Sequence, residues 1–548
     1  MRVSARTLAV AGAVGLALFL SACGDDAGIS ADTDGGGNPQ GTLTIGGCNP
    51  QNPLVPASTN EVCGGNPLDA VFSMLVKYDP VTGESQNEIA ESIQTDDNQR
   101  WTITIRDGWT FHDGTPITAA SFVDAWNWAA HGANATTNAY FFSPIEGYAE
   151  SQGETDDDGN YIEGSGSDTL SGLQLVDDRT FIVELSQPEA GFPQRLGYLA
   201  FAPMPESFYS DVEAFGQQPI GSGPFQLIAW NQGASIQLAA YDGYQGDVKP
   251  RVENITFRIY QQQEAEYADL LADNVDLMTR LPGSALTGET YKADLGSRYI
   301  EREAGTINII GFPSENADPT MSNVQLRRAI SMSIDRQLII DNIFQGVRQA
   351  ATGWVSPVVD GYLPDQCGEF CEYNPERARD LLAESGYSGS LTLTYNADGD
   401  HQAWTAAACN SISNALEIEC TPQAVPLNSE FLGTLFADEM EGMFRLGWQM
   451  DYPSIENFLV PMYATGASAN LFGYSNDEFD DLLARAAQAP EDEAISLYQQ
   501  AERLLVDDMP SIPLWYDKIV SGYSSRVNGD SVRLTPFGTI DLLSVSLR

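Results

Sequence analysis

Apolar and polar positions alternate along this chain with two different periods. Every second residue is apolar in 42–46 and 101–105, which is typical of a strand with one buried face. Apolar residues recur instead at intervals of three and four in 66–76, 478–487 and 494–506, which predicts amphipathic helices. Strands and helices are therefore expected to alternate along the chain.

Two further helices have predicted ends. Residues 322–344 carry apolar residues at helical spacing, and Ser322 with Gln325 forms the pattern of a capping box, which predicts one core-facing helix. Residues 374–386 begin with an Asn that can cap a helix, place Pro in the first turn and end on Gly. The second helix is therefore bounded at both ends by its own residues.

The N-terminus has the pattern of an exported lipoprotein. Arg2 and Arg6 precede an apolar stretch over 7–20, and small residues lead directly to Cys23. This arrangement resembles the bacterial lipoprotein signal, which is cleaved before the cysteine and lipidated on it; an ordinary secretory signal is the alternative. Residues 1–22 are thus the expected signal peptide, and the lipid would hold the protein on the outer face of the cytoplasmic membrane.

Length and charge limit the possible partners. The 548 residues suggest two to four domains, and the Gly- and Asp-rich residues 23–40 are expected to form a flexible tether. Acidic residues number 76 against 27 Lys and Arg, a net charge of −49 that repels nucleic acid and anionic lipid headgroups. The acidic residues are dispersed, which indicates a solvated surface rather than one charged site.

The cysteine count agrees with an oxidising compartment. Seven cysteines less the lipidated Cys23 leave six, an even number that indicates disulfides. Six cysteines allow 15 pairings, and we predict that sequence neighbours pair: Cys48 with Cys63, Cys367 with Cys371, and Cys409 with Cys420. No CxxC or HExxH spacing is present, so neither a metal site nor another cofactor is predicted.

Several motifs resemble one known family. From Lys77 the chain reads KYDPVTGESQNEIAES, followed by a strand, FHDGTPITA and a helix that Thr118 can cap. Residues 220–230 (IGSGPFQLIAW) place glycines where a tight turn precedes a strand, and 322–344 contains RRAISMSIDR. Over roughly residues 41–548 the chain resembles the family 5 extracellular solute-binding proteins, the oligopeptide and dipeptide receptors of ABC importers. The family uses the motif histidine, here His112, structurally.

The resemblance implies a fold. It is an α/β, two-lobed periplasmic-binding-protein-like fold of type II, with an extra subdomain in the first lobe, closing on a central cleft. The first lobe would comprise residues 41–76, 206–303 and 524–548, with 77–205 as its extra subdomain. Residues 304–523 would form the second lobe.

The resemblance also implies a binding site in the stretch RLGWQMDYPS, which starts at Arg445. In the oligopeptide-binding branch an Asp at the position of Asp451 pairs with the peptide's α-ammonium group. Arg445 and His401 would meet its carboxylate. Backbone groups of Gly447 and Gln449 would pair with the extended peptide and Trp448 would line the cavity, and these six residues are the candidate ligand-binding set: Asp451, Arg445, His401, Trp448, Gly447 and Gln449.

Other interpretations of these residues remain open. Without the resemblance, Asp451 is a turn residue, Arg445 a surface ion-pair residue and His401 a residue that caps a turn. The chain also departs from the branch at 428–430, where a Trp is common, and at 453–455, so the outer side-chain pocket is not defined.

The expected function is that of a monomeric receptor that captures extended oligopeptides and delivers them to an ABC permease, whose ATPase subunits would hydrolyse ATP. The alternatives are a receptor of the same fold for a dipeptide, metal chelate, haem or oligosaccharide, and a peptide-sensing lipoprotein without transport. An enzyme is not expected, because the three histidines lie in no nucleophile–base motif.

Overall fold

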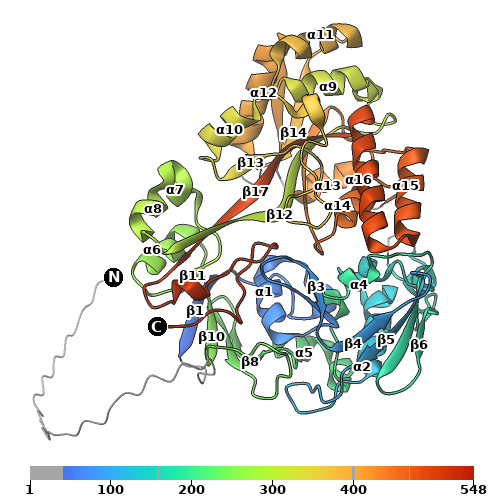
Figure 1. Ribbon diagram of the computed structural model, residues 1–548, viewed down its shortest axis with the longest axis vertical. Helices are drawn as coiled ribbons and strands as arrows, with labels where there is room; N and C mark the ends of the chain where they lie inside the picture. Colours follow the sequence, from blue (N-terminus) through green and yellow to red (C-terminus); the bar gives the residue numbers. More distant parts are fainter. Residues whose placement is uncertain (1–40, 157–159, 398–400, 427, 468) are drawn as a thin grey trace, which may run out of the picture. The chain divides into compact units, whose positions relative to one another are not determined.

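The computed structural model describes residues 41–156, 160–397, 401–426, 428–467 and 469–548 (Figure 1). The predicted signal peptide, the predicted lipidation site Cys23 and the whole predicted tether lie outside the described residues. None of the helices described is both long enough and apolar enough to span a bilayer.

The main sheet has eleven strands in the described part of the chain, in the order β15-β14-β16-β12-β17-β11-β1-β10-β9-β8, with β13 on β17. Its strands are β1 (Thr42–Gly47), β8 (Phe225–Asn231), β9 (Ser235–Ala240), β10 (Asn254–Ile259), β11 (Leu277–Met278), β12 (Tyr299–Gly311), β13 (Arg348–Ala350), β14 (Leu391–Asn396), β15 (Cys420–Val425), β16 (Met443–Gln449) and β17 (Ser511–Tyr523). The strands β12 and β17 are 13 residues long each and pair antiparallel. These two strands alone carry the sheet from β16 to β11 (Figure 1).

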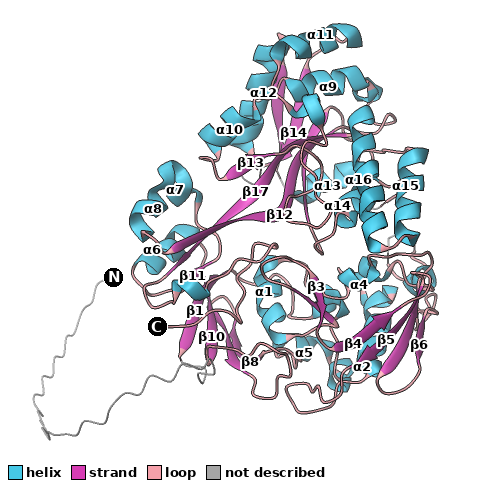
Figure 2. Cartoon of the chain, in the orientation of Figure 1, coloured by secondary structure: helices cyan, strands magenta, loops and turns pink. Residues whose placement is uncertain are grey.

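Helices lie along the main sheet, and others lie beside a smaller sheet described below (Figure 2). They are α1 (Val62–Val71), α2 (Ala119–Ala130), α3 (Tyr148–Gln152), α4 (Phe192–Arg195), α5 (Val212–Gln217), α6 (Gln263–Leu271), α7 (Gly283–Leu286), α8 (Thr290–Leu295), α9 (Val324–Met332), α10 (Arg336–Ile343), α11 (Pro375–Ser385), α12 (Gln402–Leu416), α13 (Asn428–Phe436), α14 (Glu456–Tyr463), α15 (Asp477–Gln488) and α16 (Glu491–Asp508). Short 3-10 turns include η1 (Pro56–Ser58), η3 (Ala139–Phe142), η4 (Leu199–Phe201), η7 (Pro319–Ser322) and η8 (Gly368–Cys371).

Two large hydrophobic cores divide the structure into two lobes. The first core extends from Leu43 to Leu277 and takes in C-terminal side chains as far as Val545. The second core runs from Ile307 to Tyr516. The predicted two-lobed α/β fold is confirmed, whereas the domain limits given above remain a prediction.

A smaller sheet belongs to the first core. Its strands β4 (Ala90–Gln94), β5 (Arg100–Ile105), β7 (Thr180–Glu184) and β6 (Leu173–Leu175) pair in that order. A two-stranded ladder of β2 (Val76–Tyr78) and β3 (Ser85–Asn87) lies beside it in the sequence. Helix α2 begins after Thr118, as predicted, and buries one face that includes Phe122 and Trp126.

His112 joins two of the family-like motifs. The Gly221 N–H donates to its Nδ1 at 3.2 Å, so the ring proton resides on Nε2, which lies 3.1 Å from the Gly223 carbonyl oxygen. Burial lowers the pKa of His112 to about 4, although the Gly223 contact opposes this shift. A neutral imidazole therefore holds the two segments together, which agrees with the structural role expected for it.

Positions 221 and 223 of the 220–230 motif require glycine for a reason other than the turn that the sequence suggests. A Cβ on Gly221 would lie 2.0 Å from the Val71 carbonyl oxygen, and one on Gly223 would lie 2.7 Å from the Val71 carbonyl carbon. Neither glycine has a positive φ. Close approach to the end of α1 therefore requires the small residue.

The prediction of one helix over 322–344 is wrong. The segment forms α9 and α10, separated at residues 333–335. The side chains of Asn323 and Asp335 each accept a hydrogen bond from the backbone N–H three residues further on, so each begins its own helix. Ser322 instead donates to a backbone carbonyl, and the predicted capping box does not form.

Other predicted elements form with shifted ends. The helix predicted at 66–76 is α1, which begins earlier because the Glu61 side chain accepts from a backbone N–H of its first turn and which ends at Val71. Helix α11 has the predicted ends, with Asn374 as the cap and Gly386 in the left-handed region at φ +70°. The residues that begin and end α11 are adjacent to it in the sequence, so both ends could be predicted from the sequence alone.

Three disulfides join the cysteine pairs expected from the sequence. Cys48–Cys63 ties the residue after β1 to α1, Cys367–Cys371 closes η8, and Cys409–Cys420 ties α12 to β15. Each closes a short loop.

We expect the first of these disulfides to stabilise the protein more than the second. The loop-closure model gives about 3 kcal/mol for the 15-residue separation of Cys48 and Cys63, against about 2 kcal/mol for the separation of four at Cys367 and Cys371. Thermal unfolding of the two Cys→Ser double variants measures the difference. A larger loss from the second pair would contradict this expectation.

Candidate ligand-binding site

Strand β16 has a partner strand on both sides only at its beginning. It pairs with β12 from Phe444 to Gln449, but with β14 only at Met443 and Phe444. Among the described residues, the other edge of β16 therefore has no strand partner beyond Phe444. Gly447 and Gln449 lie on this stretch and are exposed, so its backbone groups can pair with an added extended chain.

Asp451 follows this edge and is held by one amide. Its backbone N–H donates to Asn457 Oδ1 at 2.8 Å, and Asn457 Nδ2 donates to the carboxylate at 3.3 Å. The Trp448 indole N–H donates to the same Oδ1 at 3.4 Å. Asn457, which the sequence analysis did not single out, thus orients two of the predicted site residues.

The Asp451 carboxylate has no cation of its own. In the described part of the chain no Lys, Arg or His forms an ion pair with it. Burial raises its pKa to about 6, while the Asn457 amide and the more distant charge of Arg195 oppose that shift. A ligand cation would therefore meet a partly desolvated and uncompensated negative charge.

Three tyrosines of the first core's side lie within electrostatic range of Asp451. Burial raises the pKa of Tyr78, Tyr140 and Tyr198, and in each case the negative charge of Asp451 adds to the effect. The Tyr78 hydroxyl donates to the Gln194 carbonyl at 2.6 Å. The Tyr198 ring stacks on Phe141 with 4.0 Å between centroids. We call these three residues the phenol wall.

Arg195 links the two lobes beside this wall. From α4 it pairs with Glu189 and reaches Glu456 of α14 at 3.5 Å, and its guanidinium lies 5.2 Å from the centre of the Tyr452 ring. Tyr452 donates to Glu456 in turn. Burial raises the pKa of Glu456 to about 7, although the charge of Arg195 opposes this. Arg195 is therefore engaged by two glutamates.

Arg445 contacts the last residue of β14, and His401 precedes α12, the helix that follows β14. The Arg445 guanidinium donates to the side chain of Asn396, the last residue of β14, and lies 5.1 Å from the centre of the Phe431 ring. His401 precedes α12 and accepts the Trp404 indole N–H on Nδ1 at 3.1 Å. The structure thus separates the predicted residues into an Asp451 end and an Arg445 end, with Gly447 and Gln449 between them on β16.

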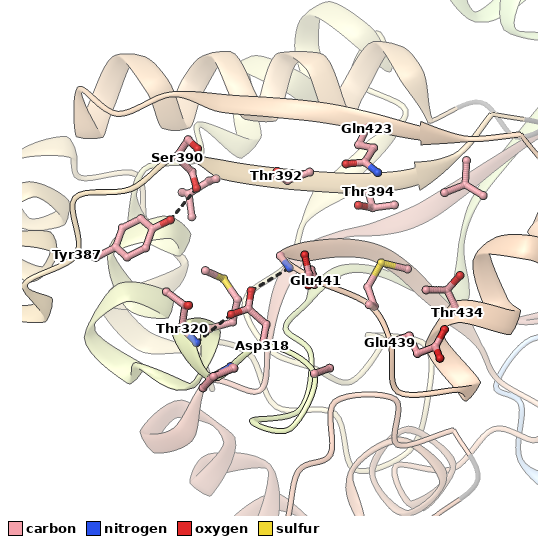
Figure 3. Close-up of a pocket in the computed structure, with 17 residues that line it drawn as sticks. Asp318, Thr320, Tyr387, Ser390, Thr392, Thr394, Gln423, Thr434, Glu439 and Glu441 are labelled. Carbon is pink, nitrogen blue, oxygen red and sulfur yellow. Dashed lines mark hydrogen bonds between the residues drawn. The ribbon is translucent and has the colours of Figure 1, made fainter.

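A hollow of about 670 Å³ lies elsewhere in the second lobe (Figure 3). Residues of β14, β15 and the segment before β16 line it, among them Thr392, Thr394 and Gln423. Asp318 bridges two backbone N–H groups there, at 2.9 and 3.1 Å. None of the predicted ligand-binding residues lines this hollow. Nor do the described residues contain a cluster of His, Cys, Asp and Glu suited to a metal ion.

Comparison with known proteins gives the family. Residues 84–470 match the middle part of the bacterial extracellular solute-binding proteins, family 5. The chain belongs to this family.

Individual relatives of this family 5 protein cover almost its whole length. It is 27% identical over 524 residues to the oligopeptide-binding protein OppA of Bacillus subtilis (strain 168), covering 91% of this chain and 92% of the relative. Among solved structures, Haemophilus influenzae OppA in complex with the peptide RPPGFSPFR has a TM-score of 0.73 at 21% identity, covering 93% and 99% of the two chains. HbpA2 from Haemophilus parasuis has a TM-score of 0.77 at 23% identity, covering 93% and 100%.

Sequence reasoning missed the phenol wall, Arg195 and Asn457. The three tyrosines come from separate segments, and no local pattern distinguishes them from the other tyrosines of the chain. Only the fold places them beside Asp451. For Asn457 the sequence held only a weak indication, namely an amide side chain six residues beyond Asp451.

We expect the ligand-free Asp451→Asn variant to be more stable than the wild type at pH 8 but not at pH 4. The folded-state pKa of about 6 lies above the ordinary value of 3.8. Between these values the unfolded chain loses its proton first, so the folded state loses stability as the pH rises. A neutral amide removes this cost of about 3 kcal/mol. Thermal unfolding of refolded, ligand-free protein measures it.

The matched control is Asp107→Asn, because Asp107 is exposed after β5. This control should leave the unfolding temperature unchanged at both pH values. If Asp451→Asn were less stable than the wild type at pH 8, the protein itself would stabilise the negative charge of Asp451, which contradicts this expectation.

Proposed function

We propose that this family 5 protein is the substrate-binding receptor of an ABC importer and captures extended oligopeptides between its two lobes. The observation that carries the proposal is the Asp451 carboxylate, which is largely buried and has no ion-pair partner among the described residues, at the end of an unpaired strand edge. A peptide with a free N-terminus supplies both a cation and an extended backbone, so it complements both features.

The α-ammonium group of the peptide would bind Asp451, and its backbone would continue along β16 past Gln449 and Gly447. This direction makes the peptide antiparallel to β16. Asp451 lies six positions after Arg445, a span of about 20 Å in extended chain. Arg445 and His401 would then meet the carboxylate of a peptide of about four to six residues.

Closure of the lobes would couple to binding through this geometry. Asp451 and β16 belong to the second core's side, whereas the phenol wall belongs to the first. A ligand that touches both favours the closed arrangement by its difference in affinity between the two states. The strands β12 and β17, which connect the two halves of the sheet, are suited to act as the hinge.

The named relatives support this assignment. The Bacillus subtilis relative is an oligopeptide-binding protein, and the Haemophilus influenzae structure holds a peptide. In the proposed role the protein binds and releases its ligand without chemical change, as a monomer, and an ABC permease with its ATPase subunits carries the peptide inward. Nucleic acid is not a partner, given the net charge of −49.

Acetylation of the peptide's α-amino group is expected to weaken binding about 100-fold or more. Calorimetry would compare free and acetylated forms of a tetrapeptide identified by mass spectrometry of co-purified ligands. Asp451→Asn should cause a similar loss for the free peptide, since a desolvated charge pair is worth about 2–5 kcal/mol. The acetylated peptide should lose little more in this variant.

Measuring both peptides with both the wild type and Asp451→Asn separates the effect of the Asp451 carboxylate on binding from the effect of the residues around it. A loss below tenfold from either change, or additive losses from both, would show that Asp451 does not bind the α-ammonium group. Asp107→Asn again serves as the control, with unchanged affinity for both peptides.

The lipid anchor is proposed on the sequence alone, because Cys23 lies outside the described residues. In a bacterial host, Cys23→Ala should move the protein from the membrane fraction to the released fraction, since one residue carries the lipid. Retention of the variant in the membrane fraction would contradict the anchor.

A further inference from the structure

Two segments of the first lobe form hydrogen bonds with the end of a helix of the second lobe. The Asn98 side chain donates from Nδ2 to the carbonyl oxygens of Ala487 and Ala489, at 3.3 and 3.4 Å. The Ala190 N–H also donates to the Ala487 carbonyl oxygen, at 3.0 Å. Both acceptors lie at the C-terminal end of α15, where carbonyl groups have no partner within the helix. The first lobe therefore caps a helix of the second.

The Asn98 amide is held in place from the first core. Its backbone is in the left-handed region at φ +58°. Its carbonyl oxygen accepts the Trp101 indole N–H at 3.1 Å and the Glu189 N–H at 2.8 Å. Trp101 is buried in the first core, whereas Ala489 is buried in the second. The Asn98 side chain thus extends from one core to the other.

The segment that follows Glu189 makes a second contact with the other lobe. A Cβ on Gly191 would lie 3.7 Å from Glu456 Oε2. Arg195 reaches Glu456 Oε1 at 3.5 Å and lies over the Tyr452 ring. Glu456 and Tyr452 are both buried. Separation of the lobes would take the cation away from a buried carboxylate, which is costly.

These contacts lie beside the residues that follow Asp451 in the chain. Tyr452, which packs against Arg195, is the next residue. The following one, Pro453, lies beside the turn between β2 and β3, because a Cβ on Gly83 would be 3.4 Å from the Pro453 Cβ. The first lobe therefore contacts both residues that follow Asp451, and the docking of the lobes sets the position of the first lobe at the site.

We propose that Asn98, Ala190 and Arg195 form a latch that holds the two lobes together and thereby sets the affinity for every peptide. This inference rests on the proposed function, because it concerns how the lobes close on the ligand. All contacts of the latch join protein atoms, so they favour the closed arrangement whether or not a peptide is bound. The apparent affinity falls in proportion to the closed fraction. Asn98 is thus a positioning residue that acts without touching the ligand.

Asn98→Asp tests the latch, because it places a second oxygen against two carbonyl groups and still tolerates the left-handed backbone. Spin labels on Asp107→Cys and Leu338→Cys, both exposed and one on each lobe, report the distance between the lobes in the Cys23→Ala background. In ligand-free protein, double electron–electron resonance should show a smaller short-distance population for the variant than for the parent. Saturating Ala-Ala-Ala-Ala should restore that population, because a peptide adds its own contacts to both lobes.

Calorimetry gives the effect on binding. Asn98→Asp should weaken binding of Ala-Ala-Ala-Ala and of Ala-Phe-Ala-Ala by the same factor, about five- to tenfold. Asn98→Gly, which keeps the left-handed backbone and only removes the amide, should cause the same changes to a smaller extent. Glu417→Gly is the matched control, because Glu417 has the same φ of +58° at the exposed end of α12. This control should change neither the distances nor the affinities.

Unchanged distances in both Asn98 variants would overturn the proposal. A loss of affinity for only one of the two peptides would overturn it too, since Asn98 would then contact that ligand. Failure of saturating peptide to restore the short distance would assign Asn98 a role in folding and contradict the latch. The proposed function fails in a distinguishable way: then neither peptide binds the wild type, while the distances in ligand-free protein still report on the latch.

Discussion

The site depends on a carboxylate that the protein does not neutralise. Asp451 is largely enclosed, has one amide as its polar partner and has no ion pair in the described part of the chain. Such a charge costs free energy in the empty protein, and a bound cation removes that cost. The tendency to bind an ammonium group therefore follows from the burial of Asp451 rather than from a large number of contacts.

Asp451 keeps no counter-ion because the cation closest to it in the fold is paired with other carboxylates. Arg195 is paired with Glu189 and Glu456 and packs on Tyr452, so its charge reaches Asp451 only at a distance. On the other side, Asn457 orients the carboxylate and also receives the Trp448 N–H. The two arrangements belong to different helices, α4 and α14, one from each lobe. Asp451 therefore lies where the lobes meet.

Local signals allowed much of the fold to be predicted. The caps of α11, the alternation of β5 and the three neighbouring disulfides all depend on residues close in sequence. The segment 322–344 was predicted as one helix because its apolar spacing continues through the break at Asp335, which caps a second helix. Gly221 and Gly223 were explained by a turn, whereas the distant Val71 backbone requires them.

The site was predictable only in part. The motif around Asp451 is continuous in sequence, so a resemblance could indicate it. The three tyrosines of the phenol wall lie far apart along the chain and come together beside Asp451 only in the folded protein. Their chemistry is a property of the tertiary structure, and no spacing in the sequence encodes it.

A crystal structure of the protein with a bound tetrapeptide tests the central claim most directly. We predict that the α-amino nitrogen of the peptide lies about 3 Å from the Asp451 carboxylate, and that the peptide backbone is hydrogen-bonded to the edge of β16. A peptide bound with its N-terminus away from Asp451, or in the hollow lined by Thr392 and Gln423, would contradict it.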